Sequence, residues 1–129
     1  NKFEELLKEV FLDLAKMIVR DAEGATKFVI IKVERAASPK EAKEAAYGIA
    51  NSTLFKTALY GENANWGRII SAVGQAGVGL KDDRFTIKSS FLSEREITIV
   101  LDLNRGRYSK TVYTSDLTPQ YVKINAGYS

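Results

Sequence analysis

The spacing of apolar residues changes along this chain, and that change limits the folds open to it. Over residues 3–20 the apolar residues recur every three or four positions, which predicts a long amphipathic helix. In the last third, residues 84–88, 95–103 and 108–117 alternate between apolar and polar, which predicts strands. Helical segments followed by a run of strands are typical of an α+β layered domain, with helices packed on a mixed or antiparallel sheet.

Local signals place the remaining elements. Residues 27–33 are β-branched and apolar and predict a buried strand. Ser38, Pro39 and Glu41 form a capping box that starts a second helix, whose alanine-rich face indicates close approach to the sheet. Asn63 or Asn65 is expected to cap a short helix over residues 66–76, closed by Gly77.

Short connections complete the predicted order. The sequence "NRG" at 104–106 indicates a tight hairpin between the last two alternating segments. Residues 120–129 are expected to form a final strand or an extended tail. The predicted order along the chain is therefore a helix, a strand, two helices and then four strands. We expect residues 1–129 to form a single domain, since 129 residues is an ordinary domain length.

Composition excludes several kinds of chemistry. The chain has no cysteine and no histidine, which removes disulfides, thiol nucleophiles, imidazole bases and the usual zinc ligands. Its net charge of +3 comes from interspersed acids and bases, which argues against a nucleic-acid-binding domain. No apolar run reaches the length of a membrane span, and we expect a cytoplasmic protein. Because the chain begins with Asn1 rather than methionine, we expect a processed chain, an engineered chain or a fragment.

Two acids stand where the first helix should end. Asp21 and Glu23 face the negative end of the helix dipole, where each is unfavourable by roughly 0.3–1 kcal/mol when exposed. From these residues alone, Glu23 reads as a surface acid paired with Lys27 or Arg20, and Asp21 as an acid paired with Arg20. The alternative is that a cation arrives there, which would also explain an acid at that unfavourable position.

Three motifs in order resemble a known family. They are "DAEGATK" at 21–27, "KTALYGENANWGRI" at 56–69 and "SDLTPQYVKINAGYS" at 115–129. Together they resemble the C-terminal part of the ornithine acetyltransferase family, the bifunctional glutamate N-acetyltransferases of arginine biosynthesis. The resemblance runs through nearly the whole chain.

The resemblance implies a mechanism. Members of the family are made as a precursor that cuts itself into two chains and exposes a threonine nucleophile at the start of the second. That threonine moves the acetyl group of N-acetylornithine to glutamate without a metal or other cofactor, and bifunctional members also accept acetyl-coenzyme A. The implied partners are the alpha chain of the same precursor, in an alpha2-beta2 heterotetramer, and the small-molecule substrates. No nucleic acid and no membrane is expected.

The departures from the family pattern are equally specific. Asn1 lies well inside the family's second chain, so no catalytic nucleophile is expected among these residues, and this chain alone is expected to be inactive. A longer insert that the family usually has between Ser90 and Phe91 is absent. Ala22 replaces a glycine, and the tail ends one residue early. A catalytically inactive stand-alone domain, or an engineered scaffold derived from the family, is the alternative.

The resemblance assigns substrate contacts residue by residue. Glu23 corresponds to the glutamate that binds the amino-acid substrate, and it would hold the amine of ornithine. Asn125 corresponds to the substrate-binding asparagine. Ser129 corresponds less directly to the terminal threonine or serine that contacts substrate, because it falls one place early.

The segment "NANWGR" allows two interpretations. In one, Asn65 caps a helix whose first amides receive a carboxylate, with Arg68 close by. In the other, Asn65 only caps the helix, Trp66 fills the core and Arg68 pairs with Glu62. The residues alone favour the second.

Overall fold

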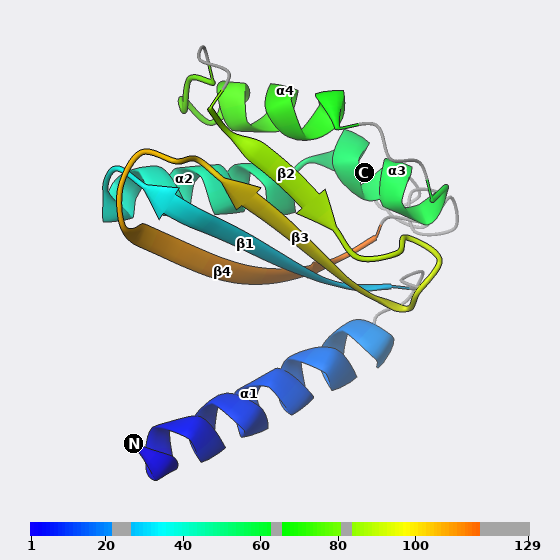
Figure 1. The fold of residues 1–129 in the computed structure, drawn as a ribbon. Coiled ribbons are helices and arrows are strands. Elements are labelled where there is room, and N and C mark those ends of the chain that lie inside the picture. The colour runs from blue at the N-terminus through cyan, green and yellow to red at the C-terminus, as the bar shows by residue number, and fades with distance from the viewer. Residues whose placement is uncertain (22–26, 63–65, 81–83, 117–129) are drawn as a thin grey trace, which may run out of the picture.

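The computed structural model describes residues 1–21, 27–62, 66–80 and 84–116. Its described elements run α-β-α-α-α-β-β-β along the chain (Figure 1). They are α1 (Lys2–Asp21), β1 (Phe28–Ala36), α2 (Pro39–Ala50), α3 (Thr53–Tyr60), α4 (Gly67–Gln75), β2 (Thr86–Ser89), β3 (Glu96–Asp102) and β4 (Tyr108–Ser115). The α+β layered class is confirmed, and the segment predicted as a last strand lies outside the described residues.

The described strands form one mixed sheet in the order β2-β3-β1-β4. β1 runs parallel to β3 and antiparallel to β4, and β2 runs antiparallel to β3. Inward-facing residues of the two central strands are fully buried, namely Val29, Ile31, Val33, Ile97, Ile99 and Leu101. The two-residue alternation of the sequence therefore becomes one buried face of the sheet.

The prediction of a hairpin between the last two strands is wrong. β3 and β4 are not neighbours, because β1 lies between them. The connection instead crosses the end of β1, where the backbone nitrogens of Arg105 and Gly106 donate to the Arg35 carbonyl at 2.8 and 3.0 Å. A Cβ on Gly106 would lie 2.5 Å from the Ala36 carbonyl oxygen, so this crossing requires glycine.

Ion pairs fasten the same end of the sheet. Arg35 donates hydrogen bonds from its Nε and NH2 groups to the Asp102 carboxylate on β3, the shortest at 2.7 Å. This hydrogen bonding holds the pKa of Asp102 below its ordinary value. Arg105 joins the crossing loop to Glu41 and to the Gly79 carbonyl.

Three helices cover the buried face of the sheet. The core combines the inward strand residues with Ala42, Ala45, Ala46 and Ile49 of α2, Phe55 and Leu59 of α3, and Ile69 and Val73 of α4. The predicted Ser38 cap is present, since its hydroxyl accepts from the Glu41 nitrogen at 3.1 Å. The reciprocal bond of a capping box is shifted by one residue: the Glu41 carboxylate accepts from the Ala37 nitrogen at 2.7 Å and not from the Ser38 nitrogen. The expectation that small residues bring α2 close to the sheet is confirmed.

The sequence analysis missed α3. Ser52 is its N-cap, and the Ser52 hydroxyl accepts from the Phe55 nitrogen at 3.2 Å. The preceding helix ends only two residues earlier, so the two helical patterns read as one interrupted segment. The later short helix was found, but its N-cap position is Trp66, which has a helical backbone and makes no side-chain cap bond.

Helix α1 stands apart from the other helices, on the opposite side of the sheet (Figure 1). It contacts β1 and β4. Its apolar stripe is open to solvent, with Phe3, Leu6, Leu7, Val10, Phe11, Leu14 and Met17 between 43% and 71% exposed. In the described residues no helix is long and apolar enough to cross a membrane.

Candidate functional site

The predicted substrate contacts Glu23, Asn125 and Ser129 lie outside the described residues, but the structure describes what flanks them. Glu23 comes four residues before Lys27, and Asn125 comes nine residues after Asp116. Phe28 pairs with Ser115 in the antiparallel β1–β4 ladder. The start of β1 and the end of β4 therefore meet at one end of the sheet, and the first and third motifs join the fold there.

A buried hydrogen bond ties these two flanks together. The backbone nitrogen of Lys27 donates to Oδ1 of Asp116 at 2.9 Å. Lys27 is 8% exposed and Asp116 is 2% exposed. A buried carboxylate needs hydrogen-bond donors to compensate for lost water, and the start of β1 supplies one here.

The Lys27 ammonium joins two further segments to the start of β1. Its Nζ donates to the Leu92 carbonyl at 2.8 Å and to the Glu94 carbonyl at 3.2 Å, both in the β2–β3 turn. It also pairs with Glu62, just past the end of α3, at 3.4 Å. An ammonium has three N–H donors, and each of them has an acceptor here. The Lys27 side chain therefore acts as a structural tie.

The charge of Asp116 also influences a second lysine. Lys56 on α3 is half-buried, and burial lowers the pKa of its ammonium from the ordinary value. The charge of Asp116 opposes that shift. We call Lys27, Lys56, Glu62 and Asp116 the polar junction. It gathers both signs of charge at the end of the sheet where the predicted contacts attach.

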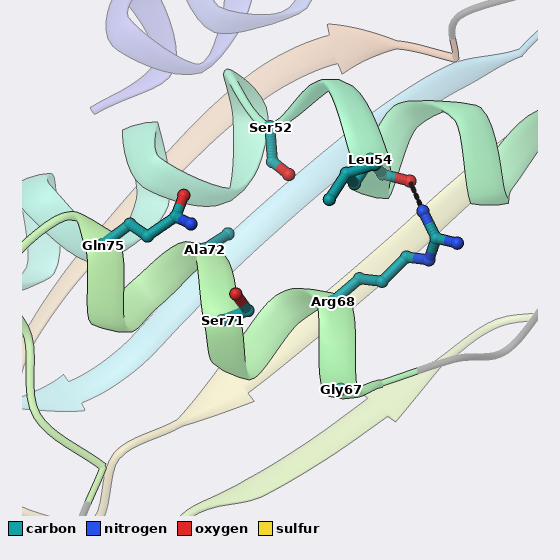
Figure 2. A pocket seen from close by; sticks show the side chains of 7 residues that line it. All are labelled: Ser52, Leu54, Gly67, Arg68, Ser71, Ala72 and Gln75. Atoms are coloured by element: carbon teal, nitrogen blue, oxygen red, sulfur yellow. Dashed lines mark hydrogen bonds between the residues drawn. The ribbon is translucent and has the colours of Figure 1, made fainter.

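The second motif also contributes to a shallow pocket between α4 and the α2–α3 connection (Figure 2). Its volume is about 380 Å³, and it is lined by Ser52, Leu54, Gly67, Arg68, Ser71, Ala72 and Gln75. Arg68 reaches across to α3 and donates to the Leu54 carbonyl at 3.1 Å. No member of the polar junction lines this pocket.

The two interpretations of "NANWGR" are partly decided. Glu62 pairs with Lys27, and Arg68 bonds to Leu54, so the expected Arg68–Glu62 pair is not the arrangement found. Trp66 is half-buried and packs against the core, as expected. Asn65 lies outside the described residues, and the idea that the first amides of the helix receive a carboxylate stays a prediction.

The fold and the polar junction define an α+β domain in which charged residues of both signs gather, largely buried, at one end of a mixed sheet. The sequence identifies which family this domain comes from. The sequence pattern of the ArgJ family matches residues 1–92 and 88–129, and the chain belongs to that family. This confirms the resemblance found from the three motifs.

Individual relatives agree with this assignment. The arginine biosynthesis bifunctional protein ArgJ of Geobacter sulfurreducens is 45% identical over 98% of this chain. The mitochondrial ArgJ of Dictyostelium discoideum is 39% identical over 97% of it. The crystal structure of ArgJ from Bacillus halodurans superposes with a TM-score of 0.86 at 36% identity, covering 98% of this chain and 70% of that one.

The chain is shorter than these relatives. It spans 38% of the length of the Geobacter protein and 37% of the Dictyostelium protein. The Geobacter alignment runs over 148 positions, although this chain has 129 residues, so that relative carries additional residues. The two matched stretches overlap at residues 88–92, at the end of β2 and the start of the β2–β3 connection, where the family insert was expected to be absent.

Sequence reasoning overlooked the polar junction, although its members stand in the quoted motifs. Lys27 was read as a strand start, and Lys56 and Asp116 were not singled out. The sequence did offer a clue to this cluster: Lys27 stands at the start of an apolar strand, and Asp116 follows a predicted strand. Such charged residues are rarely buried without a partner.

Proposed function

We propose that this chain forms one side of the substrate pocket of an acetyltransferase that moves the acetyl group of N-acetylornithine to glutamate in arginine biosynthesis. The observation that carries the proposal is the pairing of Phe28 with Ser115. It joins the motif that holds Glu23 and the motif that holds Asn125 to the same end of the sheet. The Lys27–Asp116 bond fixes the two attachment points relative to each other.

In this proposal Glu23 holds the substrate amine and Asn125 makes a polar contact to it, with a weaker assignment for Ser129. The competing interpretation pairs Glu23 with Lys27 or Arg20. The pair with Lys27 is disfavoured because all three N–H donors of the Lys27 ammonium already have acceptors among the described residues. A cation from the substrate would explain the placement of Glu23 better.

The nucleophile is proposed to be a threonine in the part of the family pattern outside these residues, exposed by self-cleavage of a precursor. The oxyanion donors would come from the alpha chain, and one such donor contributes roughly 3–4 kcal/mol in the transition state. This chain alone is therefore expected to be inactive. The active form is expected to be an alpha2-beta2 heterotetramer in the cytoplasm that needs no cofactor, with acetyl-coenzyme A as a further acetyl donor in bifunctional members.

The lengths of the relatives support the two-chain form. The match covers 38% of the Geobacter protein but 70% of the crystallised Bacillus chain. The crystallised chain is therefore little more than half as long as the Geobacter protein, as one product of a cut precursor would be. An inactive stand-alone or engineered scaffold is the second candidate, favoured by the short connection between β2 and β3, next to which the two family matches meet.

The proposal is tested by Glu23→Gln in the complete enzyme, because glutamine keeps the shape of the side chain and removes its charge. A hydrogen bond to a charged group is worth about 1.5–3 kcal/mol, so kcat/KM for N-acetylornithine should fall roughly 10- to 150-fold. Self-cleavage should be largely spared. Glu9→Gln removes the same charge from exposed α1 and is the matched control. Unchanged kcat/KM in Glu23→Gln would refute the binding role.

A further inference from the structure

We propose that the shallow pocket between α4 and the α2–α3 connection binds a small carboxylate that also carries a neutral polar group, such as an N-acylated amino acid, with Arg68 holding the carboxylate. The pocket shares no residue with the polar junction, so this inference goes beyond the proposed acetyl transfer and does not depend on it. Its volume of about 380 Å³ suits a ligand of this size, since small-molecule pockets range over roughly 300–1,000 Å³.

The guanidinium of Arg68 is anchored but only partly used. Its NH1 group donates to the Leu54 carbonyl at 3.1 Å, which fixes the side chain between α4 and α3 (Figure 2). Its Nε and NH2 groups donate to none of the residues that the structure describes. In Arg35 the same two groups bind the Asp102 carboxylate through bonds of 2.8 and 2.7 Å. Among the described residues, Arg68 therefore leaves unused the pair of donors that matches a carboxylate best.

The charges around the pocket favour an anion. Ser52 is the N-cap of α3 and Gly67 is the first residue of α4, and both line the pocket. The N-terminal ends of two helices, which carry partial positive charge, therefore meet there. Arg68 adds a full positive charge, and among the residues that the structure describes no aspartate or glutamate lines the pocket.

The end of α2 leads into the same connection, and its last carbonyls carry partial negative charge. Two of them accept from the backbone that follows the helix: the Tyr47 carbonyl from the Asn51 nitrogen at 2.9 Å, and the Ile49 carbonyl from the next nitrogen at 3.1 Å. The Ala50 carbonyl accepts from the Thr114 hydroxyl on β4 at 3.3 Å. These acceptors are committed within the fold, so they do not compete with a ligand for the donors of the pocket.

The other polar groups of the pocket are neutral. The Ser52 and Ser71 hydroxyls point toward one another across it, and Gln75 lies at the end opposite Arg68 (Figure 2). The Ser52 hydroxyl accepts from the Phe55 nitrogen at 3.2 Å, which leaves its own proton to donate. Arg68 and Gln75 are two turns apart on α4, about 10 Å along its axis. A ligand whose carboxylate lies at Arg68 would thus place a neutral polar group, such as an amide, beside the serine and glutamine side chains.

The test is an NMR titration of the ¹⁵N-labelled chain with two matched probes. N-acetylglycine carries a carboxylate and an amide, and N-acetylglycinamide replaces the carboxylate by an uncharged amide. The Arg68 Nε–H resonance and the backbone amides of Ser71 and Gln75 report on the pocket. We expect saturable shifts of all three with N-acetylglycine. The affinity for N-acetylglycinamide should be about 10- to 150-fold lower, because a hydrogen bond between two charged groups is lost.

Two variants assign the carboxylate to Arg68. Arg68→Met removes the guanidinium and should lower the affinity for N-acetylglycine to that of the neutral probe. Arg107→Met, at an exposed arginine of the β3–β4 connection, is the matched control and should keep the wild-type affinity. The spectrum of each variant also shows whether it folds. If Arg68→Met does not fold, the comparison of the two probes on wild type decides alone.

Three results would overturn the proposal. One is the absence of a saturable shift at the three reporter groups, and another is equal affinity of wild type for the two probes. The third is wild-type affinity for N-acetylglycine in a folded Arg68→Met variant. Saturable shifts at Lys27 but not at Arg68 would place the ligand at the polar junction, which also refutes binding in this pocket.

Discussion

Asp116 is the residue on which the geometry of the polar junction depends. Its carboxylate is 2% exposed and accepts from the Lys27 backbone nitrogen at 2.9 Å. It stands at the boundary between β4 and the tail that carries Asn125. One side chain therefore connects the start of β1 to the residue that follows β4.

Replacing Asp116 by alanine should destabilise this chain. The Lys27 nitrogen would lose its acceptor inside the fold, and a buried donor left unsatisfied costs about 1–3 kcal/mol. Thr111→Ala, at an exposed position of the same strand, should change stability by less than about 0.5 kcal/mol. Urea unfolding of both variants measures the difference. Equal midpoints would show that the Lys27–Asp116 bond contributes nothing.

At this scale the sequence predicted only part of the site. The three motifs pointed to Glu23 and Asn125 through their resemblance to a family, and that family is confirmed. Burial of Lys27 and Asp116 could not be predicted, because it follows from the pairing of two strands about 80 residues apart in the chain. Arg68 was assigned the wrong partner because Glu62 is also within reach of Lys27.

Among the elements, α2 and α4 are held close by a glycine. A Cβ on Gly48 would lie 2.7 Å from the Cβ of Ala76 and 3.2 Å from the Ala72 carbonyl oxygen. A Cβ on Gly74, which lies on α4, would meet no atom within 4 Å. An added methyl group would therefore clash at Gly48 but would be accommodated at Gly74.

These two glycines give a matched test of the packing. Gly48→Ala should destabilise the chain by about 1–3 kcal/mol, because the added methyl overpacks the α2–α4 contact. Gly74→Ala should stabilise it by about 0.5–1 kcal/mol, since alanine loses less conformational entropy in a helix. Chemical denaturation measures both. A stabilised Gly48→Ala variant would contradict the close approach of these helices.

Most elements were predictable from local patterns, and the errors have physical causes. Amphipathic spacing gave α1, alternation gave β2, β3 and β4, and a capping box gave the start of α2. The helix α3 was missed because Asn51 and Ser52 leave almost no gap after α2. The "NRG" turn was read as a hairpin because local sequence does not reveal that β1 separates β3 from β4.

The whole molecule has two unequal faces. Helices α2, α3 and α4 cover one face of the sheet, whereas α1 stands on the other side with its apolar stripe exposed (Figure 1). An exposed apolar surface of this kind usually marks a contact with further protein. The chain spans 38% of the Geobacter relative, so the remaining family sequence is the partner we expect for this stripe.

The central claim is that this chain supplies substrate contacts while the nucleophile lies elsewhere in the enzyme. In the most direct measurement, the complete enzyme is incubated with N-acetylornithine and no glutamate, so that the acetyl group stays on the enzyme. The acetylated residue is then located by peptide mass spectrometry. We predict one acetyl group on a threonine-bearing peptide outside residues 1–129, and none within them. An acetyl ester on a hydroxyl within residues 1–129 would contradict the account.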